Sequence, residues 1–384
     1  MNVAERKAVA ALREKTRDLL TPKYDTDFNL ARWAIGHNFD LDEAAVHLIR
    51  HLKLRRFHDL DAAPSIPLHP ILDKYFPIKI IGETGRDNTL LVAECAGRID
   101  LKGILKAVQL SDFLNQRYSF QERVLEQLNE MERRTGRQAS VVYILDLDGL
   151  KLDSWLLSVV TGPYRILWAS VYTNYPEWIS TMFIINCPPF MSLLWKAIYP
   201  LLPERTREKI QICTTASEAK TAARQLIVPS RLPAEWGGDL VGNKAAVAVA
   251  TVHDPIPSSI ALSQLVIPAR KSALITYTVE AKGPIYLVLN RFCDRTFGQT
   301  LYYCEELDDA VETEKMRDWA PYFDFPGMPT VDRMRERLPG PGTVRICFSN
   351  EGAWIRSLDI RYRVLFENEE GEKIPFTESK IAIQ

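Results

Sequence analysis

The hydrophobic pattern of this chain changes its period close to residue 240. Before that point, short apolar runs alternate with longer segments in which apolar residues recur every three to four positions. After it, short runs of alternating apolar and polar residues follow one another, separated by Gly, Pro and Asn. The first pattern predicts a largely parallel sheet covered by helices, and the second predicts an antiparallel β-sandwich.

Three segments are therefore expected in a chain of 384 residues, which is longer than one hydrophobic core supports. Residues 1–62 read as a helical module, with Asp40 as the N-cap of one helix. Residues 63–242 hold the alternating strands and helices, and residues 243–384 hold the sandwich. Prolines between residues 64 and 77 indicate a connector without regular structure.

The expected elements can be stated by range. The α/β segment should contain strands at 77–81, 89–95, 139–147, 182–186 and 209–214, and helices at 110–134 and 153–172. The sandwich should contain strands at 275–279, 285–289, 344–348 and 360–366.

One short helix, expected over residues 189–201, is apolar on nearly every side. Its sequence is PFMSLLWKAIYPL, and its main apolar stripe is formed by Phe190, Leu193, Leu194, Ala197, Ile198 and Leu201. Met191, Trp195 and Tyr199 extend the apolar surface to the other faces. The segment is too short to span a bilayer, which needs about 20 residues. It is therefore either a core helix or a helix that faces lipid.

Several function classes lack their sequence signals. A net charge of −1 gives no support for nucleic-acid binding. The first 15 residues are charged and have no signal-peptide core, and six scattered cysteines fit a reducing cytosol. We find no nucleophile elbow, dinucleotide fingerprint or Walker motif, so we expect no enzymatic activity and no cofactor.

Two groups of polar residues have ordinary structural interpretations. His47 and His51 have the i, i+4 spacing of a metal pair, but no further ligand motif accompanies them, so we interpret them as solvated residues of a helix face and expect no metal site. Asp146 and Asp148 follow an apolar strand and precede Gly149, which indicates a turn at the strand end rather than a catalytic carboxylate pair.

Three stretches together resemble a known family. VVYILDLDGL, YPEWISTMFIINCPPFMSLLWKAIYPLLPERTREKI and LPAEWGG, in this order, resemble the CRAL-TRIO domain of lipid-binding and transfer proteins, including phosphatidylinositol transfer proteins. The first 60 residues resemble the helical module of that family, and the β-rich tail resembles a GOLD domain. This architecture is similar to that of the supernatant protein factor, or tocopherol-associated protein, group.

The resemblance implies a lipid cavity closed by a gate. The helix with Phe190, Met191, Leu194, Trp195 and Ile198 corresponds to the family's gate helix. It also implies a headgroup site: Tyr175 and Glu177 stand at the first and third positions of the family's YPER motif, and Thr206 and Lys209 match its T-x-x-K-I motif.

One site residue departs from the family pattern. His37 stands where the family motif RARKFD has an arginine, and it is largely neutral at pH 7. This weakens the expectation of phosphoinositide binding and favours less polar ligands such as a tocopherol or squalene, and an arginine at position 37 should raise phosphatidylinositol affinity.

The resemblance as a whole implies a cytoplasmic protein that holds a phospholipid or other hydrophobic molecule and exchanges it at membranes. The GOLD-like part implies a Golgi or secretory-pathway protein partner. The alternative is a lipid-regulated adaptor that acts through GOLD-mediated protein contacts.

Overall fold

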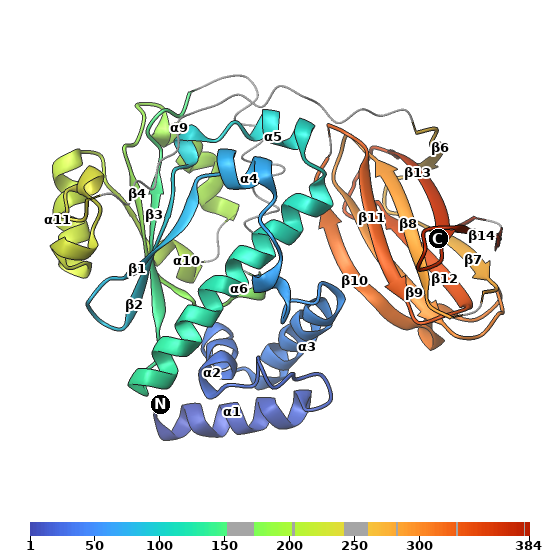
Figure 1. The fold of residues 1–384 in the computed structure, drawn as a ribbon, viewed down its shortest axis with the longest axis horizontal. Coiled ribbons are helices and arrows are strands. Elements are labelled where there is room, and N and C mark those ends of the chain that lie inside the picture. The colour runs from blue at the N-terminus through green and yellow to red at the C-terminus, as the bar shows by residue number, and fades with distance from the viewer. Residues whose placement is uncertain (152–172, 202–203, 242–259, 282, 328, 380) are drawn as a thin grey trace. The chain divides into compact units, whose positions relative to one another are not determined.

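The computed structural model describes residues 1–151, 173–201, 204–241, 260–281, 283–327, 329–379 and 381–384 (Figure 1). The chain divides into two compact units. The first comprises Met1–Ile104 and Asn115–Val252, and the second comprises Leu105–Leu114 and His253–Gln384. The helix expected at 153–172 lies outside the described residues.

The first unit begins with three helices. Their bounds are α1 (Val3–Thr16), α2 (Asp27–Gly36) and α3 (Leu41–Phe57). Asp40 is the N-cap of α3, since its side chain accepts hydrogen bonds from the backbone N–H groups of Asp42 and Glu43, as predicted. The expected connector contains a short helix instead of irregular chain alone: α4 (Pro70–Tyr75) starts at Pro70, where the missing N–H costs nothing.

A five-stranded sheet forms the centre of this unit, with the order β1-β2-β3-β4-β5. The pair β1–β2 is antiparallel and the other three pairs are parallel, which confirms the prediction of a mostly parallel sheet. The strands are β1 (Ile78–Glu83), β2 (Thr89–Glu94), β3 (Ser140–Asp146), β4 (Ile179–Ile185) and β5 (Ile210–Ile212).

Helices cover the two faces of the sheet (Figure 1). On one face, alternate strand residues such as Val92, Val141 and Tyr143 pack with the long helix α6 (Leu110–Thr135) and with α1–α3. On the other face, residues such as Val142 and Phe183 pack against α11 (Ala216–Leu226). The period of two along each strand sends neighbouring side chains to opposite faces, so the central strand β3 is apolar over most of its length. The remaining described helices of four or more residues are α5 (Leu101–Ala107), α9 (Met191–Ile198) and α10 (Glu204–Glu208).

The second unit is built from two antiparallel sheets, as the sequence predicted. One has the order β10-β9-β12-β7-β15, with β16 also pairing β7, and the other has the order β11-β8-β13-β14, with β6 pairing β13. The strands are β6 (Ser263–Ile267), β7 (Ser272–Val279), β8 (Ile285–Phe292), β9 (Phe297–Cys304), β10 (Arg317–Phe325), β11 (Asp332–Leu338), β12 (Gly342–Ser349), β13 (Leu358–Glu367), β14 (Lys373–Ile374), β15 (Phe376–Glu378) and β16 (Ala382–Ile383).

Alternation along these strands produces the sandwich core. In β13, the residues Leu358, Ile360, Tyr362, Val364 and Phe366 are buried, and the residues between them are not. Among the helices in the described part of the chain, none is both long enough and apolar enough to cross a bilayer.

Candidate functional site

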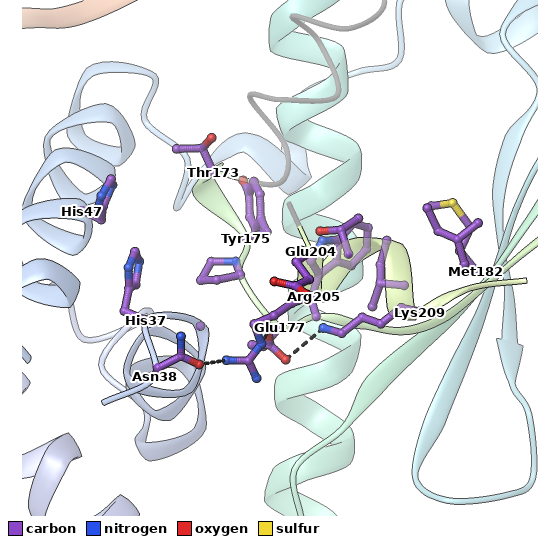
Figure 2. Close-up of a pocket in the computed structure, with 16 residues that line it drawn as sticks. His37, Asn38, His47, Thr173, Tyr175, Glu177, Met182, Glu204, Arg205 and Lys209 are labelled. Carbon is purple, nitrogen blue, oxygen red and sulfur yellow. Dashed lines mark hydrogen bonds and ion pairs between the residues drawn. The ribbon is translucent and has the colours of Figure 1, made fainter. Parts of the chain in front are cut away.

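A pocket of about 420 Å³ lies in the first unit, between the end of α2, the turn before β4, and α10 (Figure 2). The packing of Gly36 allows this geometry: a Cβ atom there would lie 3.1 Å from the Cβ of Pro176, so a side chain would push the helix end away from the turn. The pocket is lined by all five residues predicted for the ligand site, which are His37, Tyr175, Glu177, Thr206 and Lys209.

Glu177 is the central residue of the polar part of the pocket. One carboxylate oxygen, Oε2, accepts a hydrogen bond of 2.9 Å from Lys209 Nζ, and the other, Oε1, lies 3.4 Å from Arg205 Nε. Its backbone has a φ of +56°, in the left-handed region that a glutamate seldom adopts. This conformation places the carboxylate between the two cations (Figure 2).

Arg205 is a pocket residue that the sequence analysis missed. Its Nη1 donates to the carbonyl oxygen of Ile35 and, at 2.8 Å, to Oδ1 of Asn38. Arg205 therefore ties α10 to the C-terminal end of α2, where a cation also suits the helix dipole. The sequence feature that pointed to this region was the cluster of charged residues at 204–209. The cluster alone does not show which of its side chains face the pocket.

His37 occupies the wall of the pocket opposite Lys209 (Figure 2). Its ring stacks on that of His47, with centroids 4.7 Å apart and planes inclined by 18°. Burial and the neighbouring His47 lower the pKa of His37, while Glu43 acts in the opposite direction. His37 is therefore neutral at pH 7, and the cations of this pocket come from α10 and the residue that follows it.

His37, Glu43 and His47 together offer three donor atoms that lie within 4.8 Å of one another. The nearly parallel stacking of the two rings directs their in-plane nitrogen lone pairs along separate planes. A shared ion needs lone pairs that converge on one point. The observed arrangement therefore favours ring stacking over coordination.

Tyr175 presents its ring to the pocket but not a free hydroxyl group. Its hydroxyl donates a 2.7 Å hydrogen bond to Oε1 of Glu122 in the buried interior. Burial and the negative charge of Glu122 raise the pKa of Tyr175, so the hydroxyl stays protonated. Tyr175 thus shapes the pocket wall instead of offering a polar contact to a ligand.

Part of the pocket lining is apolar. It consists of Trp178, Ile179, Met182 and Ile210, which come from β4, the residue before β4, and β5. The pocket therefore offers charged and hydroxyl groups together with an apolar surface that accepts hydrocarbon.

The apolar helix of the sequence analysis is α9, followed by a 3₁₀ turn at Tyr199–Leu201. Phe190, Met191 and Trp195 pack against the core on the α6 side of the sheet, whereas Leu193 is 51% exposed and Tyr199 is also exposed. Phe190, Met191 and Trp195 thus face the core, and Leu193, a member of the expected stripe, is exposed. The side chains of the other stripe members, Leu194, Ala197, Ile198 and Leu201, lie outside the described part.

Comparisons with known proteins agree with this architecture. The model of the CRAL/TRIO domain matches residues 74–238, and the model of the F28H7_8_C:-like, C-terminal domain matches residues 250–375. The CRAL-TRIO domain-containing protein F28H7.8 of Caenorhabditis elegans is 30% identical over 96% of this chain and 91% of its own length. The chain belongs to the CRAL-TRIO family.

Two further relatives cover less of the chain. Protein real-time of Anopheles gambiae is 25% identical over 71% of this chain and 38% of its own length. The crystal structure of Sfh5 covers 66% of this chain and 93% of its own, with a TM-score of 0.51 and 17% identity, which shows the fold alone.

The three stretches that carry the CRAL-TRIO resemblance meet at one buried carboxylate. Asp146 Oδ1 accepts hydrogen bonds from Asn186 Nδ2 at 2.8 Å and from the backbone N–H of Asp148 at 2.9 Å. Its Oδ2 accepts one of 3.0 Å from Trp236 Nε1. The predicted turn role of Asp146 is therefore confirmed, and the same residue also joins the ends of β3 and β4 to the LPAEWGG segment.

A buried polar network attaches the helical module to the CRAL-TRIO domain. Arg55 of α3 donates to both carboxylate oxygens of Glu122 in α6, at 2.7 and 3.0 Å, and the guanidinium lies 4.3 Å from the ring centroid of Tyr24. The interpretation of His51 as a solvated residue was wrong, since it is fully buried and its Nδ1 lies 3.1 Å from Oδ1 of Asn174. His47, by contrast, is only half-buried.

Proposed function

We propose that this chain holds a phospholipid or another amphiphilic, hydrophobic molecule and exchanges it at membranes. The pocket supplies the polar end of the site: Lys209 and Arg205 offer positive charge, and Thr206 offers a hydroxyl group. In the structure these cations are engaged by Glu177. A phosphate that enters the pocket takes over part of this hydrogen bonding, and Glu177 continues to orient Lys209.

The observation that carries the proposal is that this pocket is lined by both charged and apolar side chains. A purely structural ion pair between Glu177 and Lys209 accounts for the charges, but it does not account for the adjoining wall of Trp178, Ile179 and Met182. An amphiphile requires both. Hydrocarbon that leaves water contributes about 0.8 kcal/mol for each buried CH₂ group, which is enough to hold a long chain without a covalent step.

The gate belongs to the same proposal. In the closed state α9 packs on the core through Met191 and Trp195, and it presents Leu193 and Tyr199 to the surroundings. These two outward side chains contact lipid when the protein meets a membrane. The helix then swings away from the sheet and opens the expected cavity between the sheet and α9.

The pocket supports an anionic headgroup more strongly than His37 alone suggests. Arg205 donates to Oδ1 of Asn38, next to the family's arginine position at residue 37, and brings a permanent charge to this part of the pocket. Phosphatidylinositol is therefore our first candidate, and a ligand without phosphate, such as a tocopherol, is the second.

The experiment is native mass spectrometry of the purified full chain. Our proposal predicts a co-purified lipid or isoprenoid, retained in the native chain and released on unfolding. A chain free of lipid that also fails to take up phosphatidylinositol, phosphatidylcholine and tocopherol from vesicles would contradict it. In the same proposal the chain acts in the cytoplasm, carries out no chemical step, and uses its GOLD-like part for a secretory-pathway protein partner.

A further inference from the structure

An apolar pair stands at one end of the C-terminal β-sandwich. Trp354 and Ile355, in the loop between β12 and β13, are 79% and 89% exposed, more than any other large apolar side chain in the described part of this unit. Single exposed apolar residues are common on proteins, but two adjacent ones at the tip of a loop form a projecting apolar surface. We call Trp354 and Ile355 the loop tip.

The loop tip is held in place by a buried asparagine. The Nδ2 group of Asn350 lies 3.1 Å from the carbonyl oxygen of Ile267, 3.0 Å from that of Pro268 and 3.0 Å from that of Arg356. Backbone hydrogen bonds between Asn350 and the β6–β7 loop, at Arg270 and Lys271, add to this. The apolar pair is therefore presented on an anchored loop, so binding through it costs little ordering entropy.

Positive charge surrounds the loop tip. Three of the loops at this end, residues 268–271, 293–296 and 350–357, carry the cations Arg270, Lys271, Arg295 and Arg356 and the anions Asp294 and Glu351. The excess is thus 4 − 2 = +2. Glu351 is further engaged by the hydroxyl of Ser272 at 2.6 Å, and Arg295 reaches the carbonyl oxygen of Ser357 at 3.3 Å.

Trp354 itself contacts one of these cations. The guanidinium of Arg270 lies 4.4 Å from the centroid of the Trp354 ring. A tryptophan flanked by arginine and lysine suits the boundary between headgroups and hydrocarbon, where the indole ring and the cations each find their preferred partners.

We propose that the loop tip docks on the surface of an anionic lipid bilayer, with Trp354 and Ile355 inserted at the boundary and Arg270, Lys271, Arg295 and Arg356 facing lipid phosphates. The inference goes beyond ligand exchange by the first unit. It assigns a membrane contact of its own to the sandwich, for which the family resemblance predicted a protein partner.

The test is sedimentation of the full chain with vesicles of phosphatidylcholine alone or of phosphatidylcholine with phosphatidylserine. The wild type should bind the anionic vesicles, and Trp354→Ala/Ile355→Ala should bind them about tenfold more weakly, because two exposed apolar side chains are removed. Leu307→Ala removes another exposed apolar side chain, at the opposite end of the sandwich, and should bind like the wild type.

A charge series tests the second half of the proposal. Lys271→Glu/Arg356→Glu should abolish the preference for phosphatidylserine, and added salt should weaken wild-type binding. Lys315→Glu/Arg337→Glu makes the same change in net charge at the opposite end and should leave binding unchanged. Equal vesicle binding by wild type and the Trp354/Ile355 variant would overturn the proposal and leave the loop tip to a protein partner.

The effect of these substitutions on vesicle binding can be distinguished from an effect on the ligand pocket. The loop-tip variants keep Glu177, Arg205 and Lys209, so uptake of phosphatidylinositol measured by native mass spectrometry should equal that of the wild type. Thermal unfolding shows whether the variants are folded. If a variant lost vesicle binding and folding together, this would count against the loop tip as a membrane contact separate from the ligand pocket.

Discussion

At the residue scale, the proposed binding of an anionic headgroup depends on the carboxylate of Glu177, which contacts both Lys209 and Arg205. Lys209 is a quarter exposed and Arg205 is 40% exposed, so the contribution of these ion pairs to stability is small. Their effect on an incoming phosphate is larger, because a hydrogen bond between charged groups contributes about 1.5–3 kcal/mol.

Lys209→Ala should therefore lower phosphatidylinositol transfer by about tenfold and leave the unfolding temperature nearly unchanged. Transfer of a ligand without phosphate, such as a tocopherol, serves as the internal control, because it offers no anionic group to Lys209. Equal phosphatidylinositol transfer by mutant and wild type would mean that Lys209 and Glu177 form only a structural ion pair.

Arg205 should contribute to the binding of anionic lipid through the shape of its guanidinium group as well as through its charge. Arg205→Ala should weaken binding of anionic lipid about tenfold. Arg205→Lys should recover only part of the loss, since a single ammonium nitrogen cannot contact Ile35 and Asn38 as Nη1 does and also approach Glu177 as Nε does. Lipid-binding titrations of the three proteins check this. Full recovery by lysine would show that the charge alone suffices.

At the scale of elements, the docking of α3 on the CRAL-TRIO domain makes stability depend on pH. Burial, followed by the positive charge of Arg55, lowers the pKa of His51 to about 3, and the rings of Tyr24, Trp33 and Tyr175 surround it. The folded pKa lies below the unfolded value, so this contribution is fully present above about pH 6.5 and is lost as the pH falls towards 3.

Lowering the pH from about 6.5 to 5 should thus cost about 2 kcal/mol through His51 alone, at 1.36 kcal/mol for each pH unit. Denaturant titrations of wild type and His51→Gln at both pH values measure this difference. The variant should lose about 2 kcal/mol less than the wild type over that range. His58, whose pKa burial lowers to about 4, contributes in the same direction in both proteins and cancels in the comparison.

The proposed role of α9 as a gate can be tested by a substitution at Leu193 and a second one at its neighbour. Leu193→Glu should slow lipid transfer several-fold without lowering the unfolding temperature, because we propose that this exposed residue contacts lipid only when the protein meets a membrane. Ser192→Glu introduces the same charge at the adjacent exposed position and should have a smaller effect. Equal slowing by both variants would indicate that added charge, not the loss of an apolar contact, is responsible.

Elements with a strong local pattern were predictable from the sequence. The strand β3, the helix α6 and the alternating β13 were placed to within two residues, because their apolar residues follow one period over their whole length. The helix α4 was missed because a proline was interpreted as a break, although proline also starts helices.

The site could be predicted only in part, since its members are far apart in the chain. The family motifs identified Glu177, Thr206 and Lys209. They could not identify Arg205, which reaches residues 35 and 38 by tertiary folding. The burial of His51 was hidden for the same reason: its helix carries charged residues on several sides, and only packing shows which face is buried.

At the scale of the whole molecule, the account describes two units with different tasks. We propose that the first unit holds an amphiphile in the pocket between α2, the turn before β4 and α10, and that the second contacts an anionic bilayer through Trp354 and Ile355. An adaptor that uses lipid only as a signal would need one bound molecule for each protein molecule, whereas a transfer protein moves many.

Transfer of fluorescent phosphatidylinositol between donor and acceptor vesicles tests this most directly. The account predicts that a small amount of the full chain moves an excess of lipid molecules over protein molecules, and that Lys209→Ala and Leu193→Glu each slow this turnover. Transfer that stops once each protein molecule has bound a single lipid, or no transfer of any lipid offered, would contradict it.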